Sequence, residues 1–533
     1  MPVTAFRLQN FMGFEDTDWI DLSNINLLFG NNSAGKSAII RALLLLQQSI
    51  ATWRPTDING RQERRQDSLV FSEPNGHDLG SFREVIRDHD TNRAMKFSFR
   101  HQFSLAENRE IHRYFDGFLA TLQLLGIVAS DLDPDAYQFE TVMLDTELSY
   151  RLQSIGDQKQ IALSAFGLYR STDNWDILEA ELDESSGEWR FESSTFGIHD
   201  PSFAWPSLRF VTRSSFFPLL DAPEGGLPQP RRADYGLGAN FSAYVYEIRD
   251  NPVTVDASSE LLKETGDTLT AFQTLLNFTL RDDIHRFVAF SYLGPVRPEP
   301  QRYIRAIQRP AIVSNPSLED VLRLWLDAKA DVILGERLAQ FNDWLEKAFG
   351  LHFYFRPVDR HNQVFEFIVK DSTGLESNLA DVGFGISQLL PILIHAACGD
   401  EMNLLIIEQP ELHLHPSGQA DLADMLIKAS CDNAMKFFIE THSEHLLLRI
   451  RRRIAENTAG ISDDVNLNCC LSDESIAVYF VYLDKNRQSI CKSVKIDSFG
   501  KMSGVSEFRG FFSDDLRELA YLNKAILSTK GNE

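Results

Sequence analysis

One stretch decides the fold of this chain: Gly30-Asn31-Asn32-Ser33-Ala34-Gly35-Lys36-Ser37. It has the form G-x-x-x-x-G-K-S, in which successive backbone N–H groups surround a chain of phosphates. The flanking residues predict an apolar strand at 25–29 and a helix from 37 to about 50. Strand, loop and helix in this order direct N–H groups and the positive end of the helix dipole at bound phosphate.

The eight residues of this phosphate loop therefore predict a nucleotide site with ATP and Mg²⁺ as its cofactors. Lys36 is expected to reach the β- and γ-phosphates, and Ser37 to coordinate the Mg²⁺ ion. A chance match in an irregular loop is the alternative interpretation. The strand and helix on either side of the loop argue against it.

Composition sets limits on the partners of the chain. The 533 residues include 52 basic and 76 acidic side chains, a net charge of −24, so any nucleic-acid site must be a local basic patch. No apolar run approaches the length of a membrane span, and the first residues lack the layout of a secretion signal. The five cysteines show no zinc-like spacing. We therefore expect reduced thiols, a cytoplasmic protein and no membrane partner.

Pattern changes along the chain predict an α/β protein in four parts. We expect a first lobe at 1–100 that carries the phosphate loop, and an insertion at 101–285 that is β-rich and then helical. A second lobe at 286–455 alternates helix and strand, and a small C-terminal domain is expected at 456–533. Within the insertion, alternating residues at 147–152 predict a half-buried strand. A polar turn at 183–188 predicts a hairpin from 178–182 to 189–191.

Two motifs in the second lobe resemble parts of a phosphate site. Asp381-Val382-Gly383-Phe384-Gly385-Ile386-Ser387-Gln388 opens an apolar helix, and a glycine- and serine-rich helix start can bind phosphate. About 20 residues later, Leu404-Leu405-Ile406-Ile407-Glu408-Gln409-Pro410-Glu411 has the pattern of a buried strand that ends in acids. A carboxylate at such a strand end lies beside the metal, directly or through water. An ordinary turn and an ordinary core strand are the alternatives.

A further strand ends in polar groups, in the stretch Lys436-Phe437-Phe438-Ile439-Glu440-Thr441-His442-Ser443. In an open α/β sheet, ligands bind outside the carboxyl ends of the strands. His442 falls at such an end. A lone histidine is more often a core residue, so His442 gains its meaning from the other motifs.

In this order, the four motifs resemble the ATPase head of ABC-type proteins. More narrowly, they resemble stand-alone bacterial ATPases of the overcoming-lysogenisation-defect (OLD) and chromosome-maintenance (SMC) groups, in which an insertion splits the head. The phrases Ile407-Glu408-Gln409-Pro410-Glu411-Leu412-His413-Leu414-His415-Pro416 and Tyr292-Leu293-Gly294-Pro295-Val296-Arg297 carry this narrower resemblance. It covers residues 1–100 and 285–455, and the tail is similar to the C-terminal domain of some members.

The resemblance implies a role for each motif. Glu408 is the metal-side acid, and His442 is the switch histidine that senses the γ-phosphate. Gly385 and Ser387 act as the signature motif, on ATP bound by the other subunit. The implied unit is a head-to-head homodimer, or a higher homo-oligomer, with ATP between the heads.

Gln409 departs from the family pattern. Many ABC-type heads have a glutamate there that polarises the attacking water, and a glutamine cannot act as a base. A glutamine can still orient a water molecule. We therefore expect slow hydrolysis, unless Glu411 or another acid substitutes for the missing base.

Three roles stay open at this stage. The first is an ATP-gated component of bacterial anti-phage defence that acts on a separate effector, such as a nuclease. The second is a DNA-repair or DNA-end-processing ATPase that works alone, and the third is a scaffold whose oligomeric state ATP fixes. For DNA, the candidate contacts are Arg449, Arg451, Arg452 and Arg453, with a looser cluster at Arg302, Arg305 and Arg309. Arginine-rich helix faces are more often solvated or paired with acids.

Overall fold

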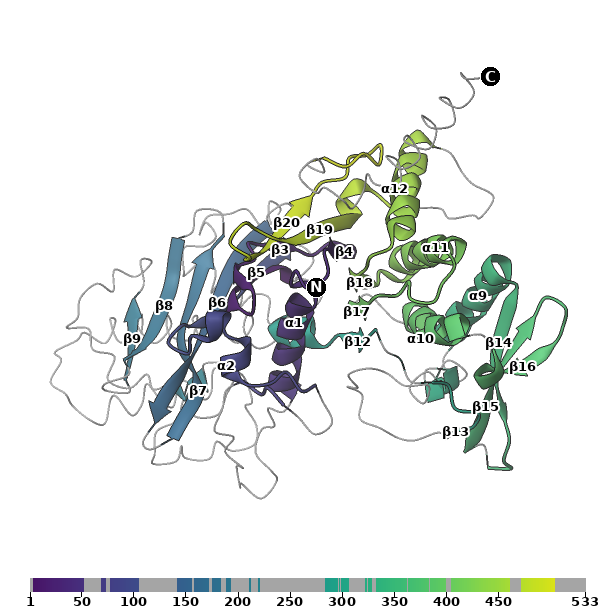
Figure 1. Cartoon of the computed structure of the whole chain (residues 1–533), viewed down its shortest axis with the longest axis horizontal. Coiled ribbons are helices and arrows are strands. Elements are labelled where there is room, and N and C mark those ends of the chain that lie inside the picture. The colour runs from purple at the N-terminus through teal and green to yellow at the C-terminus, as the bar shows by residue number, and fades with distance from the viewer. Residues whose placement is uncertain are drawn as a thin grey trace, which may run out of the picture. The chain divides into compact units, whose positions relative to one another are not determined.

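A computed structural model describes most of the chain (Figure 1). The described residues are 3–51, 69–72, 77–104, 141–155, 158–171, 175–183, 188–192, 210–211, 219–220, 283–295, 297, 299–305, 322–323, 325–327, 332–361, 363–382, 384–398, 404–460 and 471–503. They divide into two compact units. Unit 1 comprises residues 1–21 and 41–288, and unit 2 comprises residues 22–40 and 289–533.

Unit 1 contains an antiparallel sheet in the order β2-β1-β5-β6-β7-β8-β9, with β3 also paired to β1. The bounds are β1 Val3–Phe11, β2 Phe14–Asp16, β3 Ile20–Asp21, β5 Met95–Ser104, β6 Thr141–Ile155, β7 Gln158–Arg170, β8 Trp175–Asp183 and β9 Glu188–Glu192. Short elements accompany it: α2 Phe82–Val85, η1 Arg87–His89, α7 Ile284–Val288, and the strand pair β10 Phe210–Val211 and β11 Leu219–Leu220. The hairpin predicted within the insertion is confirmed as β8 paired with β9.

Unit 2 is built on a six-stranded sheet in the order β12-β17-β18-β4-β19-β20. The bounds are β4 Ile25–Gly30, β12 Ser291–Leu293, β17 Leu404–Glu408, β18 Lys436–Glu440, β19 Ile476–Leu483 and β20 Ser489–Val494. All neighbours are parallel except β19 and β20. Every residue of β4 and β17 is buried, as expected for parallel strands covered on both faces. The predicted α/β fold is confirmed, and the central strand β4 pairs with strands from the far end of the chain.

Helices and a second sheet complete unit 2. The helices are α9 Val332–Phe349, α10 Phe384–Cys398, α11 Pro416–Asn433 and α12 Glu444–Ala459, with short turns η4 Leu379–Asp381 and η5 Asp473–Ser475. The small sheet holds β13 Ile304–Arg305, β14 Leu351–Pro357, β15 Val364–Asp371 and β16 Glu376–Asn378. Helix α1, Lys36–Ala51, starts in unit 2 and continues into unit 1. The strand and helix predicted around the phosphate loop are thus present as β4 and α1.

Two expectations need correction. A separate C-terminal domain from residue 456 does not account for β19 and β20, because β19 pairs along the whole of β4 and completes the main sheet. The expectation of reduced thiols fails at Cys431, which is disulfide-bonded, while Cys491 is a buried free thiol. The helical pattern predicted at 257–280 lies outside the described residues.

Among the described residues, no helix is both long enough and apolar enough to span a bilayer.

Candidate nucleotide site

The phosphate loop leaves the carboxyl end of β4, where its backbone requires glycine. Gly30 has a φ of 146°, and a Cβ atom there would lie 1.9 Å from the carbonyl oxygen of Val481 on β19. Any larger residue would force these two paired strands apart. Ser33 and Gly35 also have positive φ, 61° and 111°, so the loop turns sharply before α1 starts at Lys36. Sequence pattern and backbone geometry therefore agree on a phosphate-binding loop.

Lys36 folds back over this loop. Its Nζ donates hydrogen bonds to the carbonyl oxygens of Gly30 and Asn31, each at 3.0 Å, and the residue is only 4% exposed. Burial lowers the pKa of the ammonium, and the carboxylates of Glu440 and Glu411 oppose that shift. The loop thus holds a buried positive charge at the place where phosphates would bind.

Ser37 contacts an acid that the motif analysis did not assign. Its Oγ donates to Oε2 of Glu440 at 2.9 Å, and Lys36 Nζ lies 3.9 Å from Oε1 of the same carboxyl group. Glu440 is the last residue of β18, the strand between β17 and β4. The acid in direct contact with the phosphate loop therefore comes from the strand next to β4.

Several groups shift the titration of Glu440. Its pKa is raised to about 7, mainly by burial and by the carboxylate of Glu408, with a smaller contribution from Glu411. The hydrogen bond from Ser37 and the charge of Lys36 act in the opposite direction. A buried acid with acidic neighbours is stabilised by any additional cation.

Glu408, the acid predicted for the metal, ends β17 in register with Glu440. Its Oε1 accepts a hydrogen bond from the hydroxyl of Tyr292 at 2.8 Å, and it is 8% exposed. Its backbone carbonyl accepts a hydrogen bond from Arg297 Nη2 at 3.2 Å. The segment 292–297 carries part of the family resemblance, and its two polar side chains, Tyr292 and Arg297, both contact the end of β17.

Arg297 also reaches the start of helix α10. Its Nη1 donates to the carbonyl oxygen of Gln388 at 3.3 Å, and the Gln388 side chain donates back to the carbonyl of Arg297 at 3.4 Å. Burial lowers the pKa of the guanidinium to about 10, while Glu411 and Tyr292 raise it. Arg297 thus ties the helix that carries the predicted signature residues to the strand that ends in Glu408.

Gln409 follows directly after β17 in a left-handed conformation, with a φ of 46°. Its backbone N–H donates to the carbonyl oxygen of Glu440 at 2.7 Å, which fixes the turn against β18. Non-glycine residues in this conformation are uncommon and concentrate at functional sites. Glutamine has no carboxylate to accept a proton from water.

Glu411 is engaged on both carboxylate oxygens. The hydroxyl of Thr441 donates to Oε2 at 2.7 Å, and the backbone N–H of His442 donates to Oε1 at 2.6 Å. Burial raises the pKa of Glu411, and the two hydrogen bonds lower it. Burial and the positive charge of Lys36 lower the pKa of His442, which favours the neutral imidazole. His442 therefore lies within the electrostatic influence of the phosphate loop.

Gly385 and Ser387 lie in the first turn of α10, and both are packed against other residues of the same chain. A Cβ atom on Gly385 would lie 2.5 Å from the carbonyl oxygen of His413, so glycine is needed for this close approach. Ser387 is 5% exposed. A contact of either residue with ATP on another subunit stays a prediction.

Several donors of the site fit Mg²⁺. The hydroxyl of Ser37 and the carboxylates of Glu440 and Glu408 are the hard oxygen ligands that this ion prefers, usually one or two per site beside substrate phosphates. Among the described residues, no group of three or more histidine, cysteine, aspartate or glutamate side chains is arranged to hold a metal.

Sequence reasoning missed the roles of Glu440, Tyr292 and Arg297. A signal was present for Glu440, because it directly precedes Thr441 and His442 at the end of an apolar strand. For Tyr292 and Arg297, the pattern shows only a short strand and a turn. Their proximity to Glu408 follows from the parallel pairing of β12 with β17.

The arginines predicted as a DNA contact lie on α12 and are engaged within the chain. Arg453 pairs with Asp424 at 2.8 Å and is 3% exposed, and Arg449 pairs with Asp424 and Asp421. All three guanidinium nitrogens of Arg453 are paired, with Asp424 and Glu456, and Nη1 of Arg449 is paired with Asp424 and Asp421.

The other two arginines of the helix have partners as well. Arg452 pairs with Glu456, and Arg451 donates to the carbonyl oxygen of Gly500 at 2.7 Å. The second cluster shows the same pairing at Arg302, which binds Asp381, while Arg309 lies outside the described residues. Pairing with acids, the alternative interpretation, thus describes Arg449, Arg452 and Arg453 of the helix and Arg302 of the second cluster, while Arg305 is exposed.

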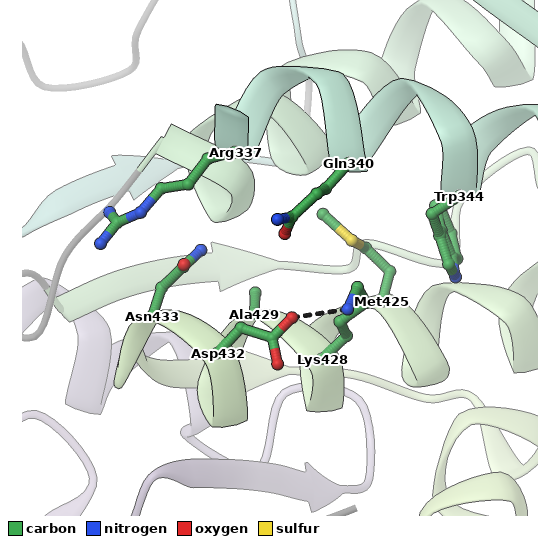
Figure 2. A pocket seen from close by; sticks show the side chains of 8 residues that line it. All are labelled: Arg337, Gln340, Trp344, Met425, Lys428, Ala429, Asp432 and Asn433. Carbon is green, nitrogen blue, oxygen red and sulfur yellow. Dashed lines mark hydrogen bonds and ion pairs between the residues drawn. The ribbon is translucent and has the colours of Figure 1, made fainter. Parts of the chain in front are cut away.

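A small cavity lies between α9 and α11 (Figure 2). Its volume is about 30 Å³, and its lining includes Trp344 and Met425 beside the ion pair of Lys428 and Asp432. This space holds roughly one or two water molecules and is far too small for a nucleotide. The groups that fit a nucleotide lie instead at the strand ends around the phosphate loop.

A mainly parallel sheet whose central strand leads into a phosphate loop defines a P-loop nucleotide-binding protein. Residues 25–449 match the family described as "AAA domain, putative AbiEii toxin, Type IV TA system". This match spans well over half of the sequence, and the chain belongs to that family. No protein among the curated proteins matches the sequence.

Solved structures similar to the chain include three SMC head domains, each 10% identical to it. The head from Pyrococcus furiosus, with an extended coiled coil and bound to the C-terminal domain of ScpA, has a TM-score of 0.34; the match covers 92% of this chain and 96% of that one. The head from Thermotoga maritima has a TM-score of 0.32, with coverages of 93% and 100%. A head bound to the C-winged helix domain of ScpA has a TM-score of 0.35, with coverages of 93% and 98%. Such TM-scores are too low to support an argument about function.

Proposed function

We propose that the chain binds ATP and Mg²⁺ at the phosphate loop and hydrolyses ATP slowly. The observation that carries this proposal is the conformation of the loop. The buried ammonium of Lys36 donates hydrogen bonds to two carbonyl oxygens of the loop, and Ser37 contacts a carboxylate at the end of the neighbouring strand. These two residues are those that phosphate loops direct at the β- and γ-phosphates and the metal.

Slow hydrolysis is supported by the contacts around Gln409. The residue after the strand acid is an amide, and the nearby Glu411 already accepts hydrogen bonds from Thr441 and His442. A general base contributes a factor of about 10² to 10⁴ to a reaction rate. A site whose acids are engaged in positioning therefore favours a long-lived ATP-bound state.

We further propose that ATP brings two heads together and that this dimer gates a separate effector in bacterial anti-phage defence. The description of the matched family as a putative toxin of a type IV toxin–antitoxin system supports a protein that acts within a multi-component system. The ion pairs of Arg449 and Arg453 on α12 weigh against the DNA-repair alternative, because these two of the four expected phosphate contacts already pair with Asp424.

ATP binding by Lys36→Ala tests the first step. We expect the variant to bind ATP at least about tenfold more weakly than the unaltered chain, since the buried ammonium is lost. Lys428→Ala is the matched control, because this lysine is paired with Asp432 on α11, away from the loop. Equal ATP affinity in the unaltered chain and in Lys36→Ala would contradict the proposed site.

Sedimentation of the purified chain tests the second step. We expect a shift to twice the monomer mass with ATP, and none for Lys36→Ala. A monomer at saturating ATP would overturn the dimer proposal without touching ATP binding.

A further inference from the structure

Glu440 is an acid of the phosphate site to which the sequence motifs give no role. It ends β18, so its backbone lies between the loop strand β4 and the strand that ends in Glu408. It is 3% exposed. A buried carboxylate in this position needs a function or a stabilising partner, because burial of an isolated charge is costly.

The hydroxyl of Ser37 contacts Glu440, one of the two acids, Glu408 and Glu440, that end adjacent strands. A serine hydroxyl has one proton to donate, and Ser37 donates it to Oε2 of Glu440. Glu408 accepts the hydroxyl proton of Tyr292 on Oε1 and is tied through its backbone to Arg297. The serine that is expected to coordinate the metal thus faces Glu440.

The spacing of these two oxygens suits a shared cation. Mg²⁺ binds oxygen at about 2.0–2.1 Å in octahedral geometry, so adjacent ligands lie roughly 2.9 Å apart. The distance from Ser37 Oγ to Glu440 Oε2 is 2.9 Å. Both oxygens could therefore coordinate one ion without a change in the backbone.

Charge supports the same assignment. The nearest ammonium to Glu440 is that of Lys36, with Nζ 3.9 Å from Oε1. Phosphate-loop lysines turn to the β- and γ-phosphates when a nucleotide binds. Glu440 would then lose its counter-charge while Glu408 and Glu411 remain close, and a divalent cation would replace it.

We propose that Glu440, rather than Glu408, is the carboxylate that coordinates Mg²⁺ beside Ser37 in this chain. The proposal rests on the proposed ATP site. It assigns Glu408 to a positioning role, in which Tyr292 and Arg297 hold the strand end that carries Gln409.

Mn²⁺ is a suitable probe, because it takes the same oxygen ligands and its binding is read by electron paramagnetic resonance. The experiment titrates Mn²⁺ into the full chain with a non-hydrolysable ATP analogue, for the unaltered protein, Glu440→Gln and Glu408→Gln. We expect Glu440→Gln to weaken Mn²⁺ binding at least about tenfold and Glu408→Gln to change it less than about threefold. The reverse order of the two variants, or equal losses in both, would overturn the proposal.

Binding of the analogue in the presence of EDTA separates this proposal from the ATP site itself. We expect Glu440→Gln to bind the metal-free analogue at least as tightly as the unaltered chain, because a negative charge next to the phosphates is removed. Absence of analogue binding by the unaltered chain both with Mg²⁺ and with EDTA would contradict the proposed function instead.

A second variant covers the case in which Glu440→Gln does not fold. Glu440→Asp keeps the charge and withdraws the carboxylate by one methylene. We expect it to fold and to bind Mn²⁺ with an affinity reduced by about tenfold. Unchanged Mn²⁺ affinity in Glu440→Asp would overturn the assignment.

Discussion

Strands β17 and β18 lie side by side in the sheet of unit 2 (Figure 1). Each ends in a buried glutamate. Glu408 is held by Tyr292 and Arg297, which come from the segment around β12 on its outer side. Glu440 lies on the inner side, against Ser37 and Lys36 of the phosphate loop. Two acids that are equivalent in register thus have different partners. Their roles follow from the neighbouring strand, and position within a motif is not sufficient to assign them.

The largest expected difference between the two acids is in ATP turnover. We expect Glu440→Gln to lower turnover by about 100-fold or more, because it removes a charge next to the metal and phosphates. Glu408→Gln is expected to lower it by less than about tenfold, since the amide oxygen can still accept the Tyr292 hydroxyl. Steady-state phosphate release measures both variants. A larger loss in Glu408→Gln would reverse the comparison.

The stability of the nucleotide-free protein is expected to depend on pH through Glu440. The folded-state pKa of Glu440, about 7, lies above the ordinary value of 4.5, so the folded state binds the proton more tightly than the unfolded state. Its contribution is fully present below about pH 4.5 and is lost as the pH rises through about 7. The loss is on the order of 2–3 kcal/mol.

Denaturant unfolding at pH 5 and pH 8 measures this contribution. Relative to the unaltered chain, we expect Glu440→Gln to gain stability at pH 8, because it removes the buried charge. Unfolding free energies whose difference between variant and unaltered chain is the same at both pH values would contradict the raised pKa.

A change at Gln409, the residue after β17, tests whether a missing general base is what makes ATP hydrolysis slow. We expect Gln409→Glu to raise ATP turnover by about tenfold, the lower end of what a general base contributes. Single-turnover kinetics with saturating Mg²⁺ would show the increase in the chemical step. No increase in Gln409→Glu, together with loss of turnover in Glu411→Ala, would identify Glu411 as the base.

The smallest expected effect concerns the support of Glu408. Tyr292→Phe removes the hydroxyl that donates to Glu408 and should cost about 1 kcal/mol of folding stability. Because the Tyr292 hydroxyl contacts Glu408 on β17, the acid that we assign to a positioning role, Mn²⁺ affinity should stay within about twofold of the unaltered value. Thermal unfolding and the same Mn²⁺ titration measure the two quantities. A tenfold loss of Mn²⁺ affinity would place Glu408 at the metal after all.

Local pattern was sufficient for the phosphate loop and for its strand and helix. Gly30, Gly35 and Lys36 form a motif of fixed spacing, and the geometry of the motif depends on adjacent residues. The apolar run at 404–407 is likewise a strand by its own composition, and it is buried on both faces.

The partners of the acids could not be read from the sequence. The contact between Ser37 and Glu440 joins residues 403 positions apart, and it depends on β18 lying between β17 and β4. The same applies to Tyr292 and Glu408, 116 positions apart. Strand order is a property of the whole sheet, and a single motif contains no information about its neighbours.

The most direct test of the account is a crystal structure of the chain with Mg²⁺ and a non-hydrolysable ATP analogue. We predict the analogue in the phosphate loop, with Lys36 Nζ on its phosphates, and a metal about 2.0–2.1 Å from both Ser37 Oγ and a carboxylate oxygen of Glu440. A metal that is coordinated by Glu408, with Glu440 directed away from it, would contradict the account.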